Sequence, residues 1–176
     1  AARRQMADAA RPYRPASDML PDEQRGVDLL AFATLYVQQP DRLDDAASAL
    51  QSLLAKDPEN LIVKHNLAVL YRKQKDYDTA LKFLREILAR EAKNIAALNE
   101  LGLLYLDQKN LSMSQWILGK AMQYSKKTPN ADVFNNMGLL WMAKGETPGA
   151  VQMFQKALGA NPGHNGARKN LGALYV

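Results

Sequence analysis

The chain has 176 residues, of which 47% are hydrophobic, and a formal net charge of +5. This length allows one domain or a tandem array of repeats with a sizeable core, and no stretch reaches the ~18 consecutive apolar residues of a membrane-spanning helix. The sequence has no cysteine, which excludes disulfides, thiolate metal sites and a cysteine nucleophile.

The charge is unevenly distributed. Residues 27–60 carry two basic and six acidic side chains, whereas residues 61–94 carry eight basic and four acidic ones. Neighbouring segments of opposite sign differ from the uniform basic stripe of a nucleic-acid-binding protein. Nucleic acid is therefore not expected as a partner.

Residues 1–26 precede any regular pattern. Pro12, Pro15 and Pro21 interrupt helix formation there, so we expect a partly ordered N-terminal arm, either a linker remnant or a functional tail. There is no initiator Met and no signal-peptide pattern, which suggests that the sequence starts at a processing site or at the boundary of an expressed fragment.

A repeat begins near residue 27. Its clearest copies read "NLAVLYRKQKDYDTALKFL" (66–84), "ELGLLYLDQKNLSMSQWIL" (100–118) and "NMGLLWMAKGETPGAVQMF" (136–154). Within each copy, two segments with helical spacing flank a short polar turn, so each copy is predicted to be an antiparallel helix pair. The predicted repeats are 27–60, 61–94, 95–130, 131–164 and a half repeat, 165–176.

This pattern resembles the tetratricopeptide repeat family. The family's large, small and closing positions correspond here to Phe134, Met137, Gly138, Trp141, Ala150, Phe154, Ala157 and Pro162. The resemblance covers residues 27–176 and implies an all-α helix-pair solenoid, a right-handed superhelix of four helix pairs plus a terminal helix. Ala92 departs from the pattern where a Pro is expected, Lys64 replaces a large residue, and two residues are inserted near 126–130.

No constellation of catalytic residues is present. His65 and His164 have no metal-binding spacing, and the sequence lacks a GxSxG motif and a phosphate-binding glycine loop. We therefore expect a non-enzymatic protein without a cofactor or metal.

In a helix-pair solenoid the first helix of each pair lines the concave surface. After the packing positions are removed, two rows remain on these helices, three residues apart and therefore adjacent. The polar row contains Phe32, Asn66, Glu100, Asn136 and Asn170. The apolar row contains Leu35, Val69, Leu103 and Leu139, with Leu106 and Met142 one turn further on.

Both rows have two interpretations. The resemblance implies that Asn66, Asn136 and Asn170 contact the main chain of a bound peptide, although they could instead tie neighbouring repeats together. The apolar row predicts a nonpolar strip for a partner, unless neighbouring helices cover it. The predicted partner-binding set is completed by four flanking residues: Arg72, Lys73, Asn99 and Asn135.

A second surface is suggested by "SQWIL" (114–118). It places Trp116, and Met113 three residues earlier, where other copies have the polar Lys82 and Gln152. Either the N-terminal arm or a longer loop covers this Trp, or it makes a second contact on the convex side.

The sequence thus predicts a protein–protein interaction scaffold that binds an extended or helical segment of a partner protein in its groove. One alternative is a recognition module cut from a larger enzyme. Another is a structural protein that self-associates through its last helix, which carries Leu171, Leu174 and Tyr175. A bacterial periplasmic or envelope location is suggested by the family resemblance alone.

Overall fold

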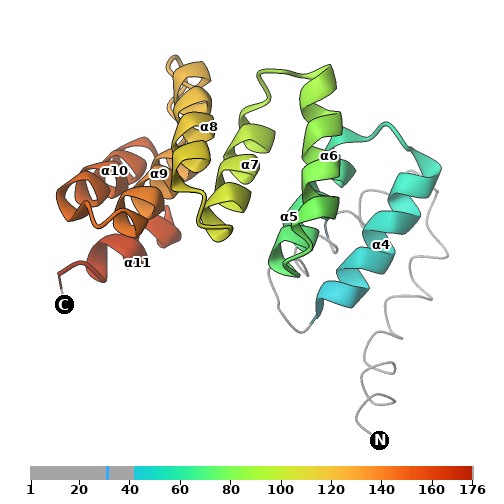
Figure 1. Ribbon diagram of the computed structural model, residues 1–176, viewed down its shortest axis with the longest axis horizontal. Helices are drawn as coiled ribbons and strands as arrows, with labels where there is room; N and C mark the ends of the chain where they lie inside the picture. Colours follow the sequence, from blue (N-terminus) through green and yellow to red (C-terminus); the bar gives the residue numbers. More distant parts are fainter. Residues whose placement is uncertain (1–30, 32–41, 176) are drawn as a thin grey trace, which may run out of the picture. The chain divides into compact units, whose positions relative to one another are not determined.

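The computed structural model describes residue 31 and residues 42–175. All regular elements in these residues are α-helices, which confirms the predicted all-α fold (Figure 1). The helices are α4 (Leu43–Lys56), α5 (Leu61–Lys73), α6 (Tyr77–Arg90), α7 (Ile95–Asp107), α8 (Leu111–Tyr124), α9 (Ala131–Ala143), α10 (Thr147–Ala160) and α11 (Asn165–Gly172). The chain divides into two compact units, Ala1–Leu70 and Tyr71–Val176.

The first unit contains α4 and most of α5. Helix α4 buries Ala46, Ala49, Leu50 and Leu53, spaced as one helical face, and α5 buries a similar face that includes Leu67 and Leu70. The predicted N-terminal arm, together with Phe32 and Leu35, lies outside the described residues.

In the second unit, consecutive helices pack side by side. Helix α7 packs against α8, and α9 packs against α10, while α7 also contacts α9, and α9 contacts α11 (Figure 1). Leu118 of α8 forms a buried cluster with Met137 and Leu140 of α9 and Met153 of α10. The core is therefore continuous from one helix pair to the next.

Two glycines set the spacing within these pairs. A Cβ atom built on Gly102 would lie 2.5 Å from Cγ of Leu118, and one built on Gly138 would lie 2.5 Å from the Phe154 ring. Both distances are far below van der Waals contact, so a larger residue would push the two helices apart. In the same region the Ser114 hydroxyl donates a hydrogen bond of 2.8 Å to the Gly102 carbonyl.

The helix starts and the turns also recur. Asn60, Asn94 and Asn130 each accept a hydrogen bond from the backbone N–H three residues on, at the N-termini of α5, α7 and α9. The turns within the pairs pass through positive φ at Lys75 (64°), Lys109 (61°) and Gly145 (78°). Loop 125–130, between α8 and α9, is two residues longer than loop 91–94, between α6 and α7.

Gly138→Ala is expected to destabilise the protein by about 1–3 kcal/mol, because overpacking against Phe154 outweighs the better helix propensity of Ala. Urea unfolding measures the change. Gly119 of α8 is the matched control, since a Cβ there meets no atom within 4 Å. Gly119→Ala should stabilise by up to about 1 kcal/mol. Equal effects of the two variants would contradict the role assigned to Gly138.

Candidate functional site

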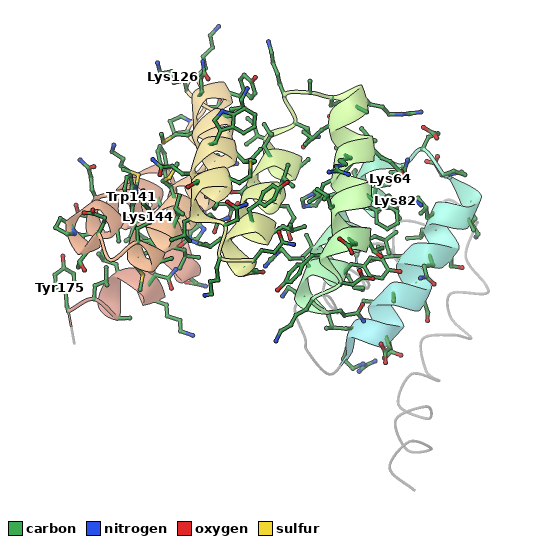
Figure 2. All side chains as sticks on the ribbon, viewed as in Figure 1. Lys64, Lys82, Lys126, Trp141, Lys144 and Tyr175 are labelled. Atoms are coloured by element: carbon green, nitrogen blue, oxygen red, sulfur yellow. The ribbon has the colours of Figure 1, made fainter. Side chains whose placement is uncertain are left out.

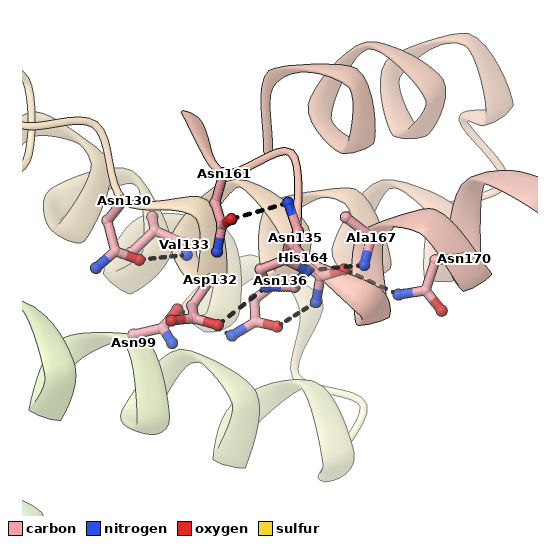
Figure 3. Close-up of polar contacts among 11 residues, drawn as sticks. Asn99, Asn130, Asp132, Val133, Asn135, Asn136, Asn161, His164, Ala167 and Asn170 are labelled. Atoms are coloured by element: carbon pink, nitrogen blue, oxygen red, sulfur yellow. Dashed lines mark hydrogen bonds and ion pairs between the residues drawn. The ribbon is translucent and has the colours of Figure 1, made fainter. Parts of the chain in front are cut away.

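In the second unit, a row of hydrogen-bonded side-chain amides crosses α7, α9 and α11, which are the first helices of their pairs (Figure 3). Asn170 of α11 donates from Nδ2 to Oδ1 of Asn135 at 2.9 Å, and Asn135 donates to Asn136 on the same helix at 3.0 Å. Asn136 in turn donates to Oδ1 of Asn99 on α7, also at 3.0 Å. We call these four residues the amide chain; it links α7, α9 and α11, and every bond runs in the same direction.

The amide chain is partly internal. Asn136 is only 6% exposed and Asn135 is also buried, whereas Asn99 and Asn170 at the two ends are half-buried. These bonds are of the kind expected if the asparagines tie neighbouring repeats together. The two end atoms of the chain, Nδ2 of Asn99 and Oδ1 of Asn170, take part in none of its three bonds.

In α7 the position of the polar row is occupied by Glu100, which is buried at 6% exposure. Its carboxylate accepts a hydrogen bond from Nε of Arg72, and Nη1 of Arg72 bonds to the exposed Asp107 at 2.6 Å. Burial alone would lower the pKa of the Arg72 guanidinium, but Glu100 and Asp107 outweigh it, and the pKa is raised. Arg72 therefore holds the end of α5 onto α7, which sequence reasoning did not anticipate.

Lys73 follows Arg72 and is exposed. Partial burial and the neighbouring positive charge of Arg72 lower the pKa of the Lys73 ammonium, although Glu100 acts in the opposite direction. Of the two basic residues predicted to flank a partner, Arg72 is thus engaged by two carboxylates of this chain.

The apolar row of the second unit lies at intermediate depth. Leu103, Leu106 and Leu139 are half-buried, and Met142 is 38% exposed. Leu106 packs against the cluster around Met137, and Leu139 packs against the cluster around Phe154. Leu106 and Leu139 therefore partly support the core, while Met142 is the most exposed member of the row.

The two remaining described members of the rows, Asn66 and Val69, lie in the first unit. Both are half-buried, and Asn66 donates from Nδ2 to the Ile62 carbonyl of its own helix at 3.0 Å.

His164 has a role that the sequence reasoning missed. Its Nδ1 accepts a hydrogen bond of 2.9 Å from the Ala167 N–H at the start of α11, and its Nε2 lies 3.0 Å from Oδ1 of Asp132. Nδ1 must therefore be unprotonated, and Nε2–H donates to Asp132. The signal was available, because His164 stands one repeat beyond the capping residues Asn60, Asn94 and Asn130.

Of the two covers predicted for Trp116, the structure describes the loop but not the N-terminal arm, which lies outside the described residues. Trp116 is 57% exposed and Met113 is 38% exposed on α8, so loop 125–130 does not cover the Trp. Lys82 and Gln152, at the corresponding positions of α6 and α10, are exposed as well.

In the described part of the chain, no three His, Asp or Glu side chains come together as a metal-binding group. None of the described helices combines the length and the apolar character needed to cross a bilayer.

Residues 37–101 match the family model described as tetratricopeptide repeat, whereas no curated protein matches the sequence. The pilF protein of Pseudomonas aeruginosa is structurally similar, with 22% identity and a TM-score of 0.68, over 86% of this chain and 68% of that one. A thermophilic tetratricopeptide repeat protein of Thermus thermophilus shares 16% identity at a TM-score of 0.74, over 88% and 83% of the two chains.

A chain of the Cut9–Hcn1 hetero-tetramer of APC/C is 19% identical, with a TM-score of 0.74 over 98% of this chain but only 34% of that one. The family match and the shared fold confirm the sequence-based assignment. Residues 37–101 match the tetratricopeptide repeat model, and the chain as a whole has the fold of these repeat proteins. Proteins of this kind serve generally as non-enzymatic scaffolds that bind other proteins.

Asn136→Ala should lower the free energy of unfolding by about 1–3 kcal/mol, because it leaves the buried Asn135 amide and the facing oxygen of Asn99 without their partner. Urea denaturation measures the loss. Asn170→Ala, at the half-buried end of the amide chain, is the comparison and should cost about 1 kcal/mol or less. A larger loss at Asn170 than at Asn136 would contradict the assignment.

His164→Ala is expected to remove the cap of α11 at a cost of about 1 kcal/mol and to speed hydrogen exchange of the Ala167 amide. His164→Asn, which installs the capping residue of the other copies, should retain protection. Loss of protection in both variants would mean that Asp132, and not the cap, fixes α11.

Proposed function

We propose that the second unit binds an extended or helical segment of a partner protein along α7, α9 and α11. The observation that carries the proposal is an apolar strip on α7 and α9, the two helices that also hold three members of the amide chain. The strip consists of Leu103 and Leu106 on α7 and of Leu139 and Met142 on α9.

The two features supply different parts of recognition. Apolar contact with Met142 and the exposed parts of the leucines contributes affinity, because burying such surface is favourable in proportion to its area. The amide chain contributes direction, since it presents an N–H donor at Asn99 and a carbonyl acceptor at Asn170. A partner backbone offers a C=O to the first and an N–H to the second.

The half-buried leucines of the strip also contribute to the stability of the core. Leu139 packs against the core cluster of Phe154, so a polar substitution there disturbs stability as well as binding. Met142 is the cleaner site, because it is more exposed and ends the strip on α9.

Met142→Asp should weaken partner capture by about 30-fold, as expected for loss of an apolar anchor worth about 2 kcal/mol, without changing helicity or melting temperature. Affinity capture from extracts of cells that express the chain, followed by titration of the recovered partner, measures the effect. Gln155→Asp adds the same charge at an exposed site of α10 and is the control. Unchanged capture by Met142→Asp would contradict the proposal.

Two alternatives make different predictions. A recognition module of a larger enzyme requires a catalytic domain in the full-length gene. Self-association through the C-terminal end requires a concentration-dependent sedimentation coefficient. Helix α11 ends at Gly172, so Leu174 and Tyr175 lie beyond it and not on the last helix as predicted, and Tyr175 is 70% exposed (Figure 2).

A further inference from the structure

The outward face of α8 differs from the equivalent faces of α6 and α10. Those helices place Lys82 and Gln152 in solvent, where α8 places the largest side chain, Trp116. A single exposed apolar residue needs no explanation by itself. The surroundings of Trp116 therefore decide whether this face has a function.

A shallow open hollow lies beside the Trp116 ring. It is lined by one face of α8, namely Ser112, Gln115, Trp116, Gly119, Lys120 and Gln123. Gly119 weakens the middle of the helix by roughly 1 kcal/mol relative to Ala, and no packing requires it, since a Cβ there meets no atom within 4 Å. Gly119 and Trp116 line the same hollow as Gln115 and Gln123, whose amides can donate and accept hydrogen bonds.

Lys120 lines this hollow, and Lys144 contacts one of its lining residues, Gln115. The Lys120 ammonium lies 4.4 Å from the centre of the Trp116 ring. Lys144, from the turn between α9 and α10, donates a hydrogen bond of 2.7 Å to Oε1 of Gln115 and also lies over the Trp141 ring (Figure 2). Each ammonium thus lies beside an aromatic ring, Lys120 beside Trp116 and Lys144 beside Trp141, where it can attract an anion next to an apolar group.

The charged residues of α8 itself and of the two turns that flank it in the sequence are all basic. Residues 108–131 contain no Asp or Glu, and they include Lys126 and Lys127 just beyond the end of α8 (Figure 2). Residues 108–175 carry eight basic and two acidic side chains, which is more positive than the chain as a whole. The molecule complementary to this face is therefore acidic.

We propose that the α8 face binds an acidic amphipathic segment of a partner protein, separate from the segment held by α7, α9 and α11. An apolar side chain of the partner packs against Trp116 in the space above Gly119, and its carboxylates pair with Lys120 and Lys144. A protein is favoured over a membrane, because the apolar part is the Trp116 indole with the Met113 thioether, while amides line much of the rest. Interfacial membrane binding requires a broader apolar face.

The test uses the full chain and a phage-displayed library of random peptides of about 16 residues at about 150 mM salt, depleted first on the Trp116→Gln variant. The expected outcome is enrichment of peptides that combine Asp or Glu with Leu, Phe or Trp. Synthetic copies should bind at least about ten-fold more weakly to Trp116→Gln and to Lys120→Glu, and more weakly to wild type as salt rises.

Three controls accompany these measurements. Lys156→Glu reverses the exposed lysine of α10 that corresponds to Lys120, and it should leave peptide affinity unchanged. Met142→Asp should also leave it unchanged, which separates this face from the one formed by α7, α9 and α11. Trp116→Gln should melt like the wild type, because Trp116 is exposed.

The proposal is overturned if the selected peptides lack acidic residues. It is also overturned if Trp116→Gln leaves peptide affinity unchanged, or if Lys156→Glu weakens it. It is also overturned if Trp116→Gln lowers the melting temperature, since the indole would then be part of the core. A parallel arm uses phosphatidylcholine vesicles with about 30% phosphatidylserine. Sedimentation of wild type but not Trp116→Gln with these vesicles, without any acidic peptide selected, would make the face a lipid site and reject a protein partner.

Discussion

The second unit depends on the close approach of the two helices within each pair, at Gly102 in the pair α7–α8 and at Gly138 in the pair α9–α10. Each glycine lets a large side chain, Leu118 or Phe154, sit directly against the backbone of the facing helix. This contact fixes the separation of α7 from α8 and of α9 from α10. The next helix pair then packs on the surface so formed, so an error in one separation would be passed to every later helix.

The same constraint joins the two proposed binding surfaces. Helix α7 carries Asn99 and Leu103, whereas its partner α8 carries Trp116 and Lys120 on its outward side. The contact of Gly102 with Leu118 and the bond from Ser114 to the Gly102 carbonyl hold these two helices together. The pair α7–α8 would therefore hold two bound segments, one on each of its sides, at a constant distance from each other. A scaffold needs such a fixed spacing between its partners.

The helix pairs and their small contact residues could be predicted from sequence because they follow from a local period that recurs along the chain. The fate of individual polar side chains could not. Position within a repeat places Asn136 and Glu100 alike, yet one joins other amides and the other binds Arg72. The hydrogen-bond partner of each polar side chain depends on the residue that faces it from the adjacent repeat, and the type of that residue does not recur from copy to copy. The cap at His164 is an intermediate case, since its position, but not its residue type, repeats.

The single direction of the amide chain has a further consequence. If one of the two inner amides, Asn135 or Asn136, rotated by half a turn, an NH₂ group would face another NH₂ group and an oxygen would face an oxygen. Rotation of all four together restores every bond with donor and acceptor exchanged. The amide chain therefore has two self-consistent arrangements, which differ in whether the end residues Asn99 and Asn170 leave their NH₂ group or their carbonyl oxygen outside the chain.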